Sequence, residues 1–226
     1  MRSSLRKWMK NSKNALMSIL IWTLTLTLTL CFTTSFAESA EVETKTAAEK
    51  IYAEIVVENY GDIILELDPE TAPLTVANFI ELADNHFYDG LTFHRIIYGF
   101  MIQGGDPNGN GTGGSDKNIV GEFAANGIPN ELSHTRGVIS MARAYDPNSA
   151  SSQFFIMHQD ALYLDGQYAA FGKVISGMDV VDAICISVPV TDNNGSVSRE
   201  NQPVITSVRI ISAEEAAEMV GAVEQN

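Results

Sequence analysis

Cysteine and histidine are scarce in this chain. Its 226 residues include two cysteines, Cys31 and Cys185, and four scattered histidines. Cys31 lies in an N-terminal apolar segment that we expect to be removed, which leaves one thiol and no internal disulfide. The sequence has no HExxH motif and no cluster of cysteine and histidine. Because zinc sites are built from such patterns, we do not expect a zinc site.

Basic residues are half as numerous as acidic ones. The chain has 14 lysines and arginines against 28 acidic residues, a net charge of −14. Five of the cations stand in the first 37 residues, and the remainder carries 9 basic and 28 acidic residues, or −19. This charge repels nucleic acid and anionic membrane surfaces, so we exclude nucleic acid as a partner. A hydrophobic content of 45% and the length fit one globular domain with a real core.

The N-terminus has the order of a secretory signal. Residues 1–13 are basic, residues 15–32 are apolar apart from one serine and four threonines, and Ser35-Phe36-Ala37 supplies small residues. This order predicts cleavage after Ala37. The alternative is an uncleaved membrane anchor, because an apolar run of about 18 residues approaches the length of a membrane span. Leu28-Thr29-Leu30-Cys31 vaguely resembles a bacterial lipoprotein signal, but Leu30 is bulky where that signal needs a small residue, so we discount it. Either interpretation exports the domain, and the anchor would also tether it to the membrane.

Residues 51–212 show the periodicities of a mainly β domain behind a polar linker, residues 38–50. Alternating apolar residues predict a hairpin over 51–67, further strands at 138–142, 153–157 and 169–175, and a last strand at 204–211. Helical spacing predicts one helix capped by Thr71 with Pro73 in its first turn, and another over 178–185. Many short strands with two helices favour a closed antiparallel barrel. Residues 213–226 form an acidic tail that could make a frayed helix.

The segment 104–127 is rich in glycine and asparagine and predicts a long surface loop. Residues 109–114 fit the pattern GxGxxG, but no amphipathic helix follows them, so we do not expect a dinucleotide site. Asp106, Asn108 and Asn110 fit the opening of a calcium loop. Its twelfth position is Lys117 instead of glutamate, so we do not expect calcium either.

The stretch 92–106 places one arginine among apolar residues. In one interpretation Arg95 simply reaches solvent from the edge of a strand that bends at Gly99. In the functional interpretation it converges with Phe100, Met101 and Gln103 on one side of a curved sheet, since residues two apart on a strand share a face. Spacing alone leaves both interpretations open.

Four motifs in order resemble the cyclophilin-type peptidyl-prolyl cis-trans isomerases. They are FHRIIYGFMIQGGD (93–106), GVISMA (137–142), SQFFI (152–156) and LDGQYAAFGKV (164–174), and APLTVANF (72–79) resembles the family's first helix. The leader and GEFAANG (121–127) resemble exported bacterial members. The resemblance covers residues 51–212. It implies an eight-stranded antiparallel barrel capped by two helices, isomerase activity without a cofactor, proline-containing polypeptides as partners, and a monomer.

The resemblance also implies roles for single residues. The catalytic arginine falls on Arg95, and the groove beside the proline pocket falls on Ala142 and Gln153. The proline pocket falls on five residues, namely Phe100, Met101, Gln103, Phe155 and Leu164. Four positions depart from the family pattern: Arg143 replaces an asparagine whose backbone binds peptide, Tyr163 a tryptophan, Tyr168 a histidine and Tyr98 a proline. These changes leave the arginine and the aromatic floor in place, but the loss of tryptophan argues against tight cyclosporin binding.

Two other classes of function remain open. A module that binds proline peptides with little catalysis is the first, and the altered positions Arg143, Tyr163 and Tyr168 motivate it. A hydrolase is the second, because serine, histidine and aspartate are present. The sequence has no GxSxG motif to mark a nucleophile.

Overall fold

The computed structural model describes residues 50–223, so the predicted leader and nearly all of the linker lie outside the described residues. The chain begins there with the predicted hairpin, formed by β1 (Ile51–Val57) and β2 (Gly61–Leu67). The two strands pair in register, with Ile55 opposite Ile63. Their alternating apolar residues are buried on one face, as the spacing predicts. Within residues 50–223 no helix is both long and apolar enough to cross a bilayer.

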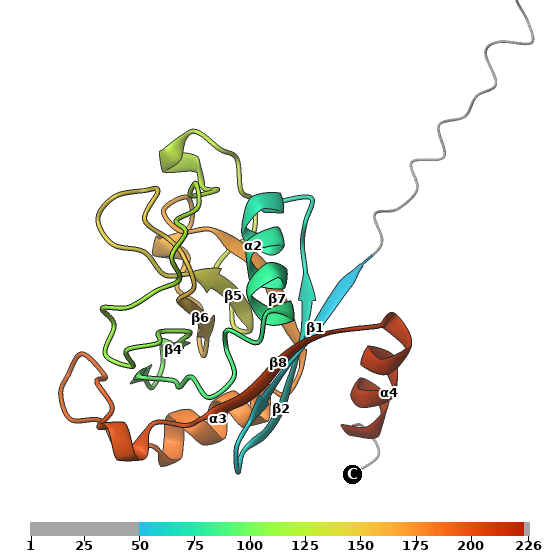
Figure 1. Ribbon diagram of the computed structural model, residues 1–226, viewed down its shortest axis with the longest axis vertical. Coiled ribbons are helices and arrows are strands. Elements are labelled where there is room, and N and C mark those ends of the chain that lie inside the picture. The colour runs from blue at the N-terminus through green and yellow to red at the C-terminus, as the bar shows by residue number, and fades with distance from the viewer. Residues whose placement is uncertain (1–49, 224–226) are drawn as a thin grey trace, which may run out of the picture. The chain divides into compact units, whose positions relative to one another are not determined.

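Eight antiparallel strands form one curled sheet (Figure 1). The remaining strands are β3 (Arg95–Ile97), β4 (Met101–Gly104), β5 (Val138–Met141), β6 (Phe154–Met157), β7 (Ala170–Ser176) and β8 (Ile205–Ile211). Their order in the sheet is β3-β4-β6-β5-β7-β2-β1-β8. The predicted bend at Gly99 is a tight turn between β3 and β4, and its φ of 79° favours glycine.

The sheet is open, so the prediction of a closed barrel is wrong. The edge strands β3 and β8 do not pair with each other. One bridge, between Thr92 and Val204, joins the segment before β3 to the beginning of β8. Closure stops there because β3 has only three residues and another segment occupies its free edge. The N–H of Ile96 donates to the carbonyl of Gly195 at 2.8 Å.

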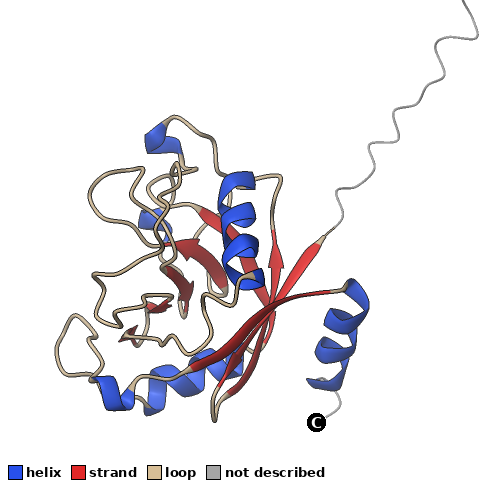
Figure 2. Cartoon of the chain, viewed as in Figure 1, coloured by secondary structure: helices blue, strands red, loops and turns tan. Residues whose placement is uncertain are grey.

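Helices cover the two ends of the curled sheet (Figures 1 and 2). Helix α2 (Pro73–Asp84) and helix α3 (Met178–Ser187) match the two predicted helices. Three short 3-10 turns, Ala124–Asn126, Leu162–Leu164 and Arg199–Asn201, lie in the connections. The acidic tail also forms a helix, α4 (Ala213–Val223), which packs Ala216 against Ile64 and Ile211 on the outer face of the sheet.

The predicted cap of α2 is wrong, although Pro73 does occupy its first turn. The hydroxyl of Thr71 donates to Asp68 at 2.8 Å and does not reach the helix. Instead, the buried carboxylate of Glu122 accepts the N–H groups of Leu74 at 3.0 Å and Thr75 at 2.8 Å. A residue 47 positions away thus satisfies donors that have no partner inside the helix.

Two apolar clusters occupy opposite faces of the strands β4, β6 and β5. Phe154 and Ile156 of β6 belong to the main core inside the curl, together with Phe79 of α2. Phe155 and Met157 alternate with them and point to the other face, where they enter a second cluster. The alternation of a strand therefore divides β6 between the core and the candidate site.

Candidate functional site

The register of four strands aligns one row of side chains across the sheet. Arg95 of β3 lies opposite Gln103 of β4, Gln103 lies opposite Phe155 of β6, and Phe155 lies opposite Ser140 of β5. Directly opposed residues in antiparallel strands share a face. A parallel row two residues away contains Met101 and Met157. For three of the four residues predicted to converge on one side of the sheet, Arg95, Met101 and Gln103, the strand register shows this arrangement. The fourth, Phe100, lies in the turn before β4 and packs against the cluster that contains Met101.

Arg95 is half-buried and held from two sides. Its Nε and Nη2 donate to the backbone carbonyl and side-chain oxygen of Asn194, at 2.9 and 3.1 Å. Its Nη1 donates to Oε1 of Gln103 at 3.2 Å. Burial lowers the pKa of Arg95 from its ordinary value. A guanidinium has five N–H groups, so two of them, one on each Nη, remain available to a substrate.

The two glutamines extend the row into a chain of hydrogen bonds. Nε2 of Gln103 donates to Oε1 of Gln153 at 2.9 Å, and Nε2 of Gln153 donates to the carbonyl of Gly113 at 2.7 Å. The chain fixes the orientation of both amides and of Arg95. The side chains of Gln103 and Gln153 also border a groove of about 340 Å³ that continues past Ala142 and Gly113. Polar groups and an adjoining groove suit an extended peptide.

The second apolar cluster forms the floor beside Arg95. Met101, Phe155 and Leu164 are buried in it, and Phe100, Ala142 and Tyr168 pack against it in part. All of these residues are predicted site residues, and the structure brings them together from two strands, β4 and β6, and from the turns and loops beside them. The edge of Tyr168 contacts the ring of Phe155, with 5.9 Å between the ring centroids. The result is an apolar cluster next to two free guanidinium donors, at the place where the resemblance implies a proline pocket.

Tyrosine and arginine side chains form the rim of this pocket. Tyr163 is 67% exposed and stacks on Phe100, with ring centroids 6.1 Å apart. Arg143 folds over the ring of Tyr168, and its guanidinium carbon lies 4.8 Å from the ring centre. Within residues 50–223 no hydrogen bond uses the backbone N–H or carbonyl of Arg143. Its backbone is thus free for a peptide, as the resemblance implies for this position.

A buried polar network lies beneath the pocket, and sequence reasoning missed it. Nδ1 of His134 lies 2.8 Å from a carboxylate oxygen of Asp165, and Nε2 lies 3.0 Å from the hydroxyl of Ser140. Because a carboxylate only accepts, Nδ1 carries the proton and Nε2 accepts from Ser140. Burial lowers the pKa of His134, although Asp165 opposes the shift. The imidazole stacks on Phe155 at 6.0 Å and so helps to fix that ring.

The same network bears on the hydrolase alternative. Ser140, His134 and Asp165 are connected in the order of a hydrolytic triad. Ser140, however, is fully buried within β5 and has 0% exposure, so its hydroxyl cannot reach a substrate. The network therefore helps to hold Phe155 in place and does not provide a nucleophile.

The calcium-like loop is organised by hydrogen bonds of its own. The buried carboxylate of Asp106 accepts the backbone N–H groups of Asn108 at 2.8 Å and Asn110 at 3.0 Å, and that of Gly111. Burial alone would raise the pKa of Asp106, but these hydrogen bonds hold it below its ordinary value. Both oxygens that a cation would need are already in use. No group of three or more potential metal ligands occurs among the described residues.

Arg95 depends on a segment that the sequence marks only as a turn. Asn194 lies in the sequence Asp192-Asn193-Asn194-Gly195, which follows α3. The segment reaches the site because Ser196 forms a bridge with Arg95 along the free edge of β3. Residues 99 positions apart meet there, and no local spacing in the sequence indicates this contact.

Comparison with known proteins adds an independent finding. A family model described as "Cyclophilin type peptidyl-prolyl cis-trans isomerase/CLD" matches residues 52–215. A probable peptidyl-prolyl cis-trans isomerase of Brucella suis is 46% identical over 149 residues, covering 63% of this chain and 76% of that protein. Peptidyl-prolyl cis-trans isomerase B of Bacillus subtilis is 44% identical over 145 residues, covering 64% of this chain and 92% of that protein.

The fold has a similar relative among solved structures. A cyclophilin-type peptidyl-prolyl cis-trans isomerase of Cryptosporidium parvum was crystallised in the presence of the dipeptide Ala-Pro. It superposes with a TM-score of 0.63 at 34% sequence identity, and the match covers 71% of this chain and 99% of that one.

Proposed function

Since the chain belongs to the family of cyclophilin-type peptidyl-prolyl cis-trans isomerases, we propose that its site accelerates rotation about X–Pro bonds in exported polypeptides. The observation that carries this proposal is the half-buried Arg95, with two free N–H groups, beside the apolar pocket of Met101, Phe155 and Leu164. The Ala-Pro dipeptide present with the Cryptosporidium relative supports a proline ring as the occupant of the pocket.

The reaction requires no covalent chemistry. Resonance gives the peptide bond double-bond character and a rotation barrier of roughly 18–20 kcal/mol. In the twisted transition state the prolyl nitrogen regains a lone pair. The free N–H groups of Arg95 donate to the substrate around that nitrogen and the prolyl carbonyl, and Gln103 fixes a neighbouring carbonyl. Phe100, Met101, Phe155 and Leu164 hold the ring while the preceding residue turns.

The energy required is modest. A thousandfold acceleration corresponds to about 4 kcal/mol of preferential binding of the transition state. One or two charge-assisted hydrogen bonds in a partly dry groove supply an energy of that order. The chain through Gln103 and Gln153 holds the donors before substrate arrives, so little ordering remains to be done during the reaction.

The direct test measures isomerisation of a short X–Pro peptide by the wild type and by Arg95→Ala. We expect the variant to fold and bind peptide but to lose kcat/KM by about a hundredfold or more. Arg199→Ala serves as the matched control, because Arg199 is an exposed arginine that does not border the apolar pocket. A folded Arg95→Ala protein with wild-type turnover would falsify this mechanism.

The same assay addresses the rival function, a proline-peptide binding module. The reason to consider such a module is that Arg143, Tyr163 and Tyr168 depart from the family pattern. A module would bind X–Pro peptides with the wild-type site intact and leave their isomer exchange at the uncatalysed rate. Measuring affinity and exchange on one peptide therefore separates the two functions.

Export remains part of the proposal. A basic segment, an apolar run and small residues precede the domain, which is the order of a secretory signal. In that setting the enzyme would speed slow proline steps in the folding of exported proteins. Expressing the whole chain and determining the N-terminal residue of the exported protein tests cleavage after Ala37. An intact leader in the membrane fraction would favour the anchor.

A further inference from the structure

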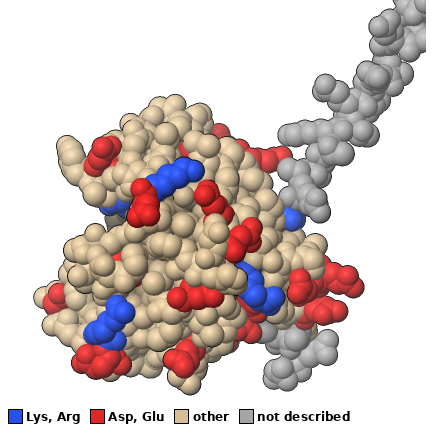
Figure 3. Space-filling view, viewed as in Figure 1, with Lys and Arg blue, Asp and Glu red and all other residues tan. Residues whose placement is uncertain are grey.

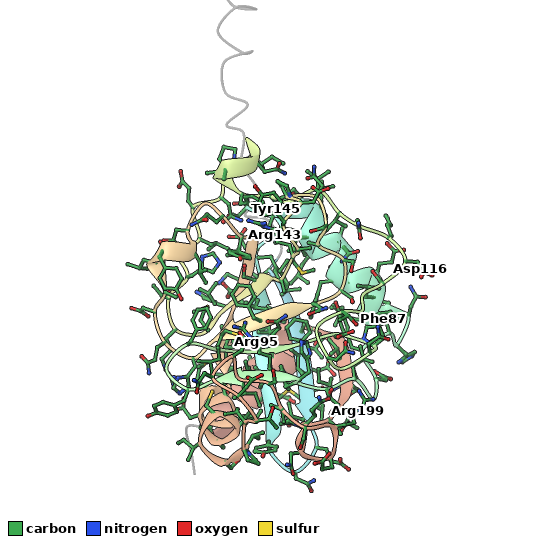
Figure 4. The ribbon with its side chains drawn as sticks, turned by 90° about the vertical axis from the view of Figure 1, so that its left-hand side faces the viewer. Phe87, Arg95, Asp116, Arg143, Tyr145 and Arg199 are labelled. Atoms are coloured by element: carbon green, nitrogen blue, oxygen red, sulfur yellow. The ribbon has the colours of Figure 1, made fainter. Side chains whose placement is uncertain are left out.

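Some basic residues of the domain lie next to a carboxylate and others do not. Residues 50–223 contain eight lysines and arginines. Five of them, Lys50, Lys117, Arg136, Lys173 and Arg209, lie within 4.0 Å of a carboxylate. In this part of the chain Arg95, Arg143 and Arg199 have no such partner. Acidic side chains outnumber basic ones on the face in Figure 3, whereas Figure 4 shows Arg143 above Arg95 on another face, with Arg199 lower and to the side.

Arg143 carries its charge in a fixed position. Its guanidinium carbon lies 5.0 Å from the ring centre of Phe123 and 4.8 Å from that of Tyr168. Nε and Nη2 donate to the carbonyl of Gln167 at 3.1 and 2.9 Å, and Nη1 donates to that of Ala144 at 2.9 Å. Carbonyl groups orient the guanidinium but do not neutralise it. The side chain therefore loses little further freedom when a ligand arrives.

This charge stands where the proline pocket meets the groove of about 340 Å³. Tyr168, which Arg143 covers, packs against the pocket floor, and Arg143 itself lines the groove. The other lining residues are glycine, alanine, serine, threonine, asparagine and glutamine, so no carboxylate opposes the cation there. The acidic charge elsewhere is screened beyond about 8 Å at physiological salt. Among the residues that line the groove, Arg143 is the one that carries a charge.

We propose that Arg143 determines substrate choice, so that the site prefers polypeptides with aspartate or glutamate within a few residues of the proline. The proposal deepens the proposed function and rests on it. The acidic side chain enters the groove beside Ala142 and Gln153 while the proline occupies the pocket. Attraction to the fixed guanidinium then raises kcat/KM for acidic sequences over basic ones of the same length.

The test compares X–Pro peptides that differ at one position, two residues before or two residues after the proline, with Glu, Gln or Lys there. For the full chain at low salt we expect kcat/KM for the Glu peptide to exceed that for the Lys peptide about fivefold on one side of the proline. The ratio should shrink at 0.5 M salt to about twofold or less. It should approach one in Arg143→Gln and persist in Arg143→Lys. Arg199→Gln removes a cation that has no carboxylate within 4.0 Å among residues 50–223 and does not line the groove, so it should keep the wild-type ratio.

Two results would overturn the proposal: equal rates for Glu and Lys peptides in the wild type, or an unchanged preference in Arg143→Gln. Turnover of the neutral Gln peptide tests the isomerase function separately. If no peptide is turned over, the isomerase function fails, and affinities of the same peptides for the same variants, measured by calorimetry, decide the role of Arg143. A Glu preference in affinity that Arg143→Gln abolishes would support it, and equal affinities would overturn it.

Discussion

At the scale of single residues, Arg95 divides its donors between the protein and the substrate. Three N–H groups bind Asn194 and Gln103, and two remain free. The three internal bonds hold the guanidinium at one angle above the pocket. An arginine without them would occupy several rotamers and would have to be ordered during each turnover, at a cost in conformational entropy.

Asn194→Ala tests this positioning. The substitution removes the acceptor of Nη2 and leaves the backbone carbonyl that accepts from Nε. We expect kcat to fall about tenfold, equivalent to about 1.4 kcal/mol, with little change in KM. The melting temperature should change little, because Asn194 is exposed. Asn193→Ala, at the neighbouring exposed position, should retain wild-type kcat. Equal kcat in both variants would show that the Asn194 side chain does not position Arg95.

The apolar part of the site could be predicted from sequence, and its polar supports could not. Met101, Phe155 and Leu164 lie in recognisable motifs, and all three are buried in one apolar cluster. Asn194 and His134 stand in segments whose local spacing indicates only a turn or a loop. Their roles depend on contacts over 99 and 31 positions, which follow from the path of the chain in three dimensions and not from periodicity.

At the scale of elements, helix α2 owes its N-terminal cap to a distant loop. The carboxylate of Glu122 accepts two backbone N–H groups and the hydroxyl of Thr75. It also places a negative charge at the positive end of the helix. Because α2 packs Phe79 into the main core, the cap couples the loop to the core.

Glu122→Ala should therefore destabilise the protein more than the loss of a solvent-exposed helix cap would. The variant leaves buried donors without an acceptor, and we expect the free energy of unfolding to fall by about 2–3 kcal/mol. Urea denaturation measures the difference. Glu58→Ala removes an exposed glutamate from the turn after β1 and should change stability by less than about 0.5 kcal/mol. A similarly small loss in Glu122→Ala would mean that water replaces the carboxylate.

The elements themselves were largely predictable, whereas closure of the sheet was not. The alternation in residues 51–67 specifies a hairpin because partner strands adjoin in sequence. Closure depends on which segment reaches the free edge of β3, and Ser196 and Gly195 take that edge. Competition between distant segments leaves no periodic signal. The prediction of the α2 cap also failed through competition between segments. Thr71 has the right residue type, but its hydroxyl donates to Asp68 instead.

At the scale of the whole molecule, buried histidines link stability to pH. His94, His134 and His158 are each at most 4% exposed. Burial lowers the pKa of all three below the ordinary value of 6.5. Both ring nitrogens of His94 lack a hydrogen-bond partner within the described part of the chain. Its neutral form is tolerated in the apolar interior, and its charged form would have no acceptor.

The direction of the pH dependence follows from these shifts. As pH falls through about 6.5, these histidines bind protons in the unfolded chain but stay neutral in the folded protein until a lower pH. The unfolded state then holds more protons, so the free energy of unfolding decreases as pH falls. Each histidine contributes up to about 1.4 kcal/mol per pH unit between the unfolded pKa and its lowered folded pKa. Above pH 7 the contribution vanishes, since both states are neutral.

Urea unfolding of the wild type and His94→Gln between pH 7.5 and 5 isolates one of these groups. We expect wild-type stability to fall steadily below pH 6.5, and the slope in His94→Gln to be shallower by up to about 1.4 kcal/mol per pH unit. His86→Gln is the control, because the His86 side chain is 78% exposed, and it should keep the wild-type slope. Parallel curves for wild type and His94→Gln would mean that His94 accepts its proton in the folded state, with Asp106 and not burial governing the ring.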